Sequence, residues 1–174
     1  MIDNETTSLP QYIGRVASLL SRFPASLTQL ALRVALAVPF FKSGLTKWDG
    51  FAQLSDSAVY LFAEEFRLHL FGFELSYPTP QLMAFLSGTG EIILPILLML
   101  GLATRFSAVG ILIMTAIIQL TIPDGWANFH LPWAAMALAV MTYGPGRVSL
   151  DHLIVRTFAP RQITNGGKRK DAHV

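Results

Sequence analysis

The chain has 174 residues, of which 52% are hydrophobic and only 14% are charged, and its formal net charge is +2. Because soluble domains carry roughly 25% charged residues, this composition excludes an ordinary soluble domain and predicts an integral membrane protein. The chain contains no cysteine, which excludes disulfides, thiolate metal sites and a cysteine nucleophile.

Three regions follow one another along the chain. Residues 1–25 are predicted to form a cytoplasmic N-terminal segment, in which Ile13, Val16 and Leu20 share an apolar helix face. Residues 26–155 are predicted to form one membrane domain, and residues 156–174 a basic cytoplasmic tail. Beside a membrane domain, such a basic cluster indicates the cytoplasmic side rather than binding to nucleic acid.

Four apolar segments in the membrane domain approach the roughly 20 residues that a helix needs to cross a bilayer. They cover about residues 26–46, 80–102, 105–122 and 128–143. The last three segments are joined by short connections, which make sequential helices antiparallel neighbours. The sequence therefore predicts an all-α fold, namely a transmembrane four-helix bundle.

The long connection between the first and second spans is predicted to contain a further helix. Its apolar residues recur at helical spacing with acidic residues between them, a pattern typical of an amphipathic helix. These residues are Leu54, Ala58, Leu61, Phe62 and Phe66. We expect this helix to lie on the extracytoplasmic membrane surface or to cap the bundle.

The distribution of basic residues predicts the orientation of the spans. Nine of the 13 Lys and Arg residues fall in the N-terminal segment, the turn near residue 104 and the C-terminal region, and only two fall on the opposite side. Cytoplasmic segments carry an excess of Lys and Arg. We therefore expect both termini in the cytoplasm and the long connection outside a bacterial inner membrane.

Polar residues within the first two spans form a predicted intramembrane cluster of Arg33, Gly44, Lys47, Ser87 and Glu91. An ionisable side chain within a span costs about 2.5–3.5 kcal/mol on insertion scales, so it normally faces the bundle interior and has a partner. Counting from the ends of antiparallel spans, we expect an ion pair between Arg33 and Glu91. Such a pair either has a function or only fastens two helices together.

A second candidate site lies near the outer end of the third and fourth spans. Gln119 precedes a segment in which His130 stands between Trp126 and Trp133. These residues are candidates to line a quinone headgroup pocket, or His130 to offer one metal ligand, while interfacial tryptophans also explain the pattern. No metal-site motif such as HExxH is present, and we predict no metal site.

Three segments together resemble the DoxX family of small four-helix bacterial membrane proteins. They are LRVALAVPFFKSGLTKW (32–48), SGTGEIILPILLMLGLATRFSA (87–108) and YGPGRVSLDHLI (143–154), within a similarity that covers about residues 26–155. The resemblance implies an association with redox systems. Some relatives accompany thiosulfate:quinone oxidoreduction, and others associate with membrane complexes that handle thiol or oxidative stress. The outer segment LSDSAVYLFAEEF also looks like a subgroup found beside genes for copper-binding modified peptides. The family offers no established catalytic residue to carry over.

Three functional hypotheses follow. The first is a membrane subunit or accessory factor of a redox or metal- and oxidative-stress-response system, with quinone as its candidate cofactor and no catalysis by this chain alone. The second is a small oligomeric transporter or export partner for an ion or small solute. The third is a membrane scaffold without its own activity. All three place the chain in a lipid bilayer with a protein partner or further copies of itself.

Overall fold

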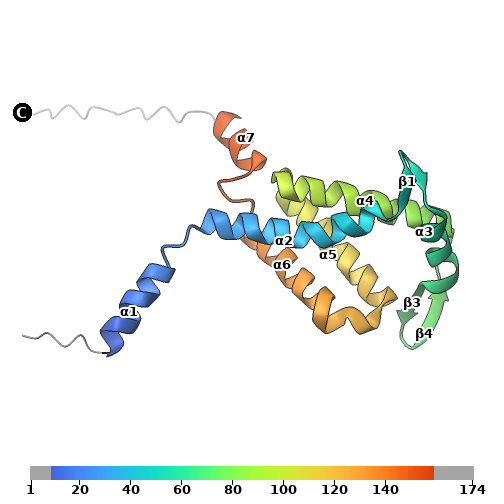
Figure 1. The fold of residues 1–174 in the computed structure, drawn as a ribbon, viewed down its shortest axis with the longest axis horizontal. Coiled ribbons are helices and arrows are strands. Elements are labelled where there is room, and N and C mark those ends of the chain that lie inside the picture. Colours follow the sequence, from blue (N-terminus) through green and yellow to red (C-terminus); the bar gives the residue numbers. More distant parts are fainter. Residues whose placement is uncertain (1–8, 159–174) are drawn as a thin grey trace, which may run out of the picture.

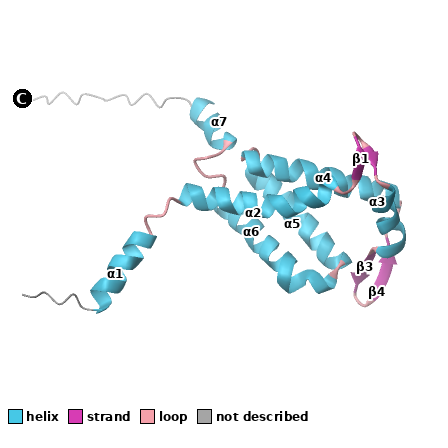
Figure 2. Ribbon diagram, viewed as in Figure 1, coloured by secondary structure: helices cyan, strands magenta, loops and turns pink. Residues whose placement is uncertain are grey.

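The computed structural model describes residues 9–158, most of which are helical (Figures 1 and 2). The longer helices are α1 (Leu9–Leu20), α2 (Ala25–Leu45), α4 (Pro80–Leu100), α5 (Thr104–Thr121), α6 (Leu131–Tyr143) and α7 (Leu150–Phe158). Shorter helical elements are α3 (Asp56–Tyr60), η1 (Leu61–Glu65), η2 (Pro123–Gly125) and η3 (Trp126–His130). Of the predicted basic tail, residues 159–174 lie outside the described residues.

Helices α2, α4, α5 and α6 close around one apolar core. α2 packs along α4, α4 against α5, α5 against α6, and α6 back against α2 (Figure 1). The core between them contains Leu36, Phe40, Leu98, Ile111 and Val140, each at most 2% exposed. Each of these four helices thus buries one face against the others and exposes the opposite face.

The outward faces of these helices are apolar, as contact with lipid requires. Ile93 on α4 and Ile113 on α5 are half-exposed. By length and composition, α4 and α5 can each cross a membrane, and α1 with α2, bent by 63° at their break, would form a third span. Helix α6 has 13 residues, which is shorter than a full span, and η3 directly precedes it.

Helices α2 and α4 run antiparallel and approach most closely where α2 ends. Gly44 lies against the backbone of Glu91, and a Cβ added to Gly44 would stand 2.9 Å from the carbonyl carbon and oxygen of that residue. One helix turn further out on α4, Gly88 receives the indole of Trp48, 3.0 Å from where a Cβ would be. Small residues allow helices to pack this closely within membranes.

The connection predicted to form one amphipathic helix contains α3 and η1. Ser55 caps α3 by accepting a hydrogen bond from the Ala58 amide at 3.2 Å, as N-cap serines do. Ala58 and Phe62 are buried against Ala84 of α4. This packing holds α3 and η1 on the outer half of α4, beyond the point where α2 ends.

Two β-hairpins, which the sequence did not lead us to expect, flank α3 and η1. Strands β1 (Trp48–Gly50) and β2 (Gln53–Leu54) form one, and β3 (Arg67–Leu70) and β4 (Phe73–Ser76) form the other, both antiparallel. The alternation of apolar and polar residues from Arg67 to Leu70 matches the period of a strand. A turn at Phe71 and Gly72, both with positive φ, is the kind that joins antiparallel strands. The helix therefore ends at Glu65, and the chain continues as a hairpin.

Helices α1 and α7 lie at the end of the bundle opposite the hairpins (Figure 1). Neither helix buries a residue. On α1 the apolar side chains of Leu9, Ile13 and Leu20 are all more than half exposed, while Arg15 on the helix and Arg22 just after it provide positive charge. Such amphipathic helices suit the interface between lipid tails and headgroups.

Replacing Gly44 with alanine should destabilise the fold, because the added Cβ would collide with the Glu91 backbone. Overpacking of this kind costs about 1–3 kcal/mol, so the midpoint of thermal unfolding of the detergent-solubilised protein should fall by several degrees. Gly14→Ala is the matched control, since nothing lies within 4 Å of a Cβ at Gly14. If both variants unfolded at the wild-type temperature, the close α2–α4 contact would be contradicted.

Candidate functional site

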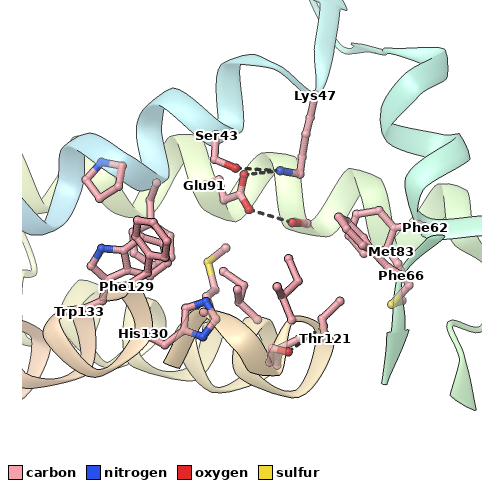
Figure 3. Close-up of a pocket in the computed structure, with 18 of the residues that line it drawn as sticks. Ser43, Lys47, Phe62, Phe66, Met83, Glu91, Thr121, Phe129, His130 and Trp133 are labelled. Carbon is pink, nitrogen blue, oxygen red and sulfur yellow. Dashed lines mark hydrogen bonds and ion pairs between the residues drawn. The ribbon is translucent and has the colours of Figure 1, made fainter. Parts of the chain in front are cut away.

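A cavity of about 770 Å³ lies within the half of the bundle nearest the hairpins (Figure 3). Its walls come from α2, η1, α4, α5, η3 and α6 and are mainly apolar and aromatic. The aromatic side chains that line it are Phe40, Phe62, Phe66, Tyr77, Phe129 and Trp133. Its ionisable side chains are Lys47, Glu91, Asp124 and His130. An apolar pocket with a few convergent polar groups is typical of a small-molecule site.

Lys47 and Glu91 form an ion pair on one wall of this cavity (Figure 3). The distance from Lys47 Nζ to Glu91 Oε2 is 2.6 Å, and the side chains are 13% and 4% exposed. Lys47 also donates to Ser43 Oγ at 3.2 Å, and Ser87 donates to Glu91 Oε1 at 3.1 Å. Ser43 with Lys47 and Ser87 with Glu91 are each four residues apart, a spacing that places helical side chains on one face.

The hydrogen-bonding capacity of this ion pair is not exhausted. A lysine ammonium has three protons, and Lys47 directs two of them to Glu91 and Ser43. Within residues 9–158 the third proton has no acceptor, so it is available to one in the cavity. Both oxygens of Glu91 have a donor, so the carboxylate is held in one orientation beside the space.

His130 faces the cavity from the opposite wall, which η3 provides (Figure 3). Its Nδ1 lies 2.6 Å from Gln119 Oε1, and the residue is 3% exposed. The Trp133 ring packs 5.5 Å from the His130 ring, and Phe40 packs 4.9 Å from Trp133. The imidazole is therefore held by a hydrogen bond on one side and by an aromatic ring on another.

The predicted ion pair between Arg33 and Glu91 is wrong. Gly44 lies against Glu91, and Arg33 is eleven residues before Gly44, or about 16 Å away along a helix with a rise of 1.5 Å per residue. The prediction counted the depth of each residue from the end of its own span. Because α2 extends beyond α4 at the end near α7, equal depths in the two helices are not equal heights in the bundle. Lys47, three residues beyond Gly44, takes the position beside the carboxylate.

Arg33 instead binds carbonyl oxygens where α4 ends. It donates to the carbonyls of Leu98 at 3.2 Å and Met99 at 3.3 Å, and also to the carbonyl of Val148. The last carbonyls of a helix lack intrahelical donors and attract positive charge. Gly101 allows this approach, since a Cβ there would meet the guanidinium. The side chain thus fastens the segment before α7 to the bundle.

Asp151 at the start of α7 caps the neighbouring helix α5. Its carboxylate accepts hydrogen bonds from the amides of Ala103 at 2.8 Å and Thr104 at 2.9 Å. Burial raises the pKa of Asp151, but the bonds from Thr104 and Ala103 and the charge of Arg33 outweigh it, so the pKa lies below its usual value. Arg33 therefore belongs to a fastening site at the opposite end from the cavity.

The two clusters predicted from the sequence meet at one cavity. Of the first, Lys47, Ser87 and Glu91 line it, and Gly44 lies behind Glu91. Of the second, His130 and Trp133 line it. Gln119 stands behind His130, and Trp126 is half-exposed and is not part of the wall.

Several lining residues were not predicted. Ser43 was detectable, because it precedes Lys47 by one helix turn. Phe62 and Phe66 belong to the connection that the sequence placed either on the membrane surface or over the bundle, and Asp124 and Tyr77 come from η2 and the chain beside the hairpins. Nothing in the local sequence shows that these segments reach the cavity. Within residues 9–158 no group of three or more His, Asp or Glu residues is placed to hold a metal ion.

The apolar surface and the long apolar helices define a helical membrane protein. A family model described as DoxX matches residues 28–124, and the chain belongs to the DoxX family. It is also 30% identical over 140 residues to a protein of Haemophilus influenzae that carries the name "Uncharacterized protein", covering 74% of this chain and 84% of that relative. No solved structure matches the chain.

Lys47→Met should destabilise the protein more than the double variant Lys47→Met/Glu91→Gln. The single change leaves Glu91 buried without its partner, which costs about 3–5 kcal/mol for buried pairs, whereas the double variant removes the charge as well. Reversible unfolding in mixed micelles measures both differences. Lys42→Met, which changes an exposed lysine of α2, is the control. Equal losses for the single and double variants would contradict the pair.

Asp151 should make the stability of the protein depend on pH in the acidic range. Because its pKa is lower in the folded state, its contribution is present above the ordinary value of 3.8 and is lost as the pH falls through the folded pKa. The midpoint of thermal unfolding should fall as the pH drops below about 4, and less steeply in Asp151→Asn. Parallel pH profiles for the two proteins would contradict this role.

Proposed function

We propose that this DoxX-family membrane protein is a subunit or accessory factor of a redox or metal- and oxidative-stress-response system, and that its cavity binds a quinone. One observation carries the proposal. The cavity has aromatic and apolar walls, with a Lys47–Glu91 pair on one wall and His130 on the other (Figure 3). This arrangement suits a flat, apolar ring with a polar oxygen at each end.

The size and lining of the cavity favour a membrane-soluble ligand. A volume of about 770 Å³ falls within the range of small-molecule pockets. Rings of Phe40, Phe129 and Trp133 offer aromatic contacts, which are stronger than burial alone predicts. The surrounding helices expose apolar side chains, so a ligand dissolved in the bilayer can reach the protein without entering water.

The residues of the chain would bind and orient such a ring. A quinone supplies two-electron, two-proton chemistry when bound. The remaining proton of Lys47 would donate to one ring oxygen, and Glu91 would accept a proton at the same end. Asp124, which also lines the cavity, offers a second carboxylate near the hairpin end.

The electrons would come from a partner protein. The chain has no cysteine, so no thiol of its own can carry them. A partner or a second copy of the chain could bind through the hairpins and α3 outside or the amphipathic helices α1 and α7 inside. We therefore propose a role as a quinone-interacting subunit rather than as an enzyme acting alone.

The proposal includes four membrane spans, about residues 26–46, 80–102, 105–122 and 128–143, in a bacterial inner membrane. Both termini would lie in the cytoplasm. The charges near the two ends of the bundle support this orientation, with Arg105, Arg147 and Arg156 on the α7 side and Glu64 and Glu65 beside the hairpins. The third span would begin next to the Arg33–Asp151 site, and α3 with η1 would lie outside.

The test is quinone binding by a variant in which the cavity is filled. Met114→Trp places a bulky ring in the wall, whereas its neighbour Ile113 is exposed and outside the wall, so Ile113→Trp is the matched control. Protein purified from bacterial membranes should retain quinone or bind decylubiquinone in one of its oxidation states. Met114→Trp should lose that binding and Ile113→Trp should keep it.

Glu91→Gln supplies a second test. This variant keeps the shape of the side chain and should lower quinone binding with the fold intact, as judged by circular dichroism. If neither oxidation state of decylubiquinone bound to the wild type, or if Met114→Trp bound as well as Ile113→Trp, the proposed function would be wrong.

A further inference from the structure

His130 is held in a single tautomer by the residues behind it. Gln119 donates from Nε2 to the carbonyl of Pro123 at 3.2 Å, which fixes the orientation of the amide. Its Oε1 therefore faces His130 Nδ1 at 2.6 Å. Because an amide oxygen only accepts hydrogen bonds, Nδ1 must carry the proton, and in a neutral imidazole Nε2 then carries a lone pair.

This lone pair is open to the cavity that His130 lines, and no described residue donates a hydrogen bond to it. Within residues 9–158, His130 Nε2 has no hydrogen bond, although the residue is 3% exposed and lines the cavity. Gly125 allows the imidazole to pack closely against the chain, because a Cβ there would stand 2.7 Å from Nε2. An acceptor held away from bulk water costs free energy unless a donor reaches it. This end of the cavity is thus suited to a ligand that donates a hydrogen bond.

The opposite wall of the cavity does not require the ligand to donate a hydrogen bond. Lys47 has one free proton to donate, and an oxygen can accept it whether that oxygen is a hydroxyl or a carbonyl. The two ends therefore differ in chemistry. Lys47 tolerates either oxygen, and His130 Nε2 distinguishes between them, since a carbonyl oxygen offers it no proton.

We propose that the cavity selects a ligand with a hydroxyl group directed at His130 Nε2, and so binds the reduced quinol in preference to the oxidised quinone. This inference rests on the proposed quinone site and adds the oxidation state that the site prefers. His130 is the residue that distinguishes the two forms, and Gln119 is the positioning residue that sets its tautomer.

The experiment compares the affinities of decylubiquinol and decylubiquinone for the purified protein under anaerobic conditions. Quenching of tryptophan fluorescence can follow binding, because Trp133 lines the cavity beside His130. The quinol should bind about tenfold more tightly, as expected for one hydrogen bond to an acceptor that is otherwise unsatisfied. The dimethyl ether of the quinol, which has the same ring and no hydroxyl, should lose this advantage.

Variants of Gln119 test the positioning role. Gln119→Met removes the acceptor at Nδ1, so the imidazole can present a proton at Nε2, and the ratio of the two affinities should fall towards unity. Gln119→Glu keeps an acceptor there and should keep the preference. Thr115→Val, one turn away on α5, removes a hydrogen bond to the Ile111 carbonyl without touching His130, and serves as the control for loss of a buried polar group.

The outcomes separate the two proposals. If both forms bind equally, or the quinone binds more tightly, the quinol preference is overturned while the quinone site stands. A preference that survives in Gln119→Met overturns the role of Gln119. If neither form binds, both the site and the preference fail.

Discussion

The close approach of α2 and α4 at Gly44 determines where the other polar groups lie. Because Gly44 has no side chain, the backbone of α2 rests on that of Glu91, and this contact fixes the register of the two helices. Lys47, just beyond Gly44, then meets Glu91, while Arg33 is carried to the far end of α4. The position of this one glycine thus determines that Lys47 pairs with Glu91 beside the cavity, whereas Arg33 binds carbonyls at the end of α4.

Two polar sites at opposite ends of the bundle have different chemical characters. At the end near α7, the hydrogen bonds of Arg33 and Asp151 go to backbone groups, although Arg33 Nε and Thr104 Oγ1 are buried there without a partner among the described residues. At the hairpin end, Lys47 and His130 each keep one unused hydrogen-bonding position beside an open space. Buried ionisable groups in a membrane are costly. Arg33 and Asp151 bind backbone carbonyls at the end of α4 and backbone amides at the start of α5. Lys47, Glu91 and His130 instead face a cavity that can hold a ligand.

The sequence predicted the helical segments well, because long apolar runs and short connections leave few alternatives. It also selected Lys47, Ser87 and Glu91, since their helical spacing places them on inward faces. It failed on Arg33, because counting residues from span ends assumes helices that end at equal depth. It could not place His130 opposite Glu91, since the rotation and tilt of α5 and η3 depend on tertiary packing. The hairpins were missed because the apolar residues before them matched a helical period.

The cavity exists because α2 ends partway along α4. Helix α2 ends at Leu45, level with Glu91, whereas α4 continues outward to Pro80. Over that outer half, α3 and η1 take the place of α2 against α4, and Phe62 and Ala58 pack on Ala84. These short elements leave space between α4 and the outer end of α5 that a continuous helix would fill. The Lys47–Glu91 pair lies where the helix stops, so a ligand entering the space meets charge at its inner wall. The long connection, which the sequence predicted to contain an amphipathic helix on the membrane surface or over the bundle, therefore forms part of the cavity wall.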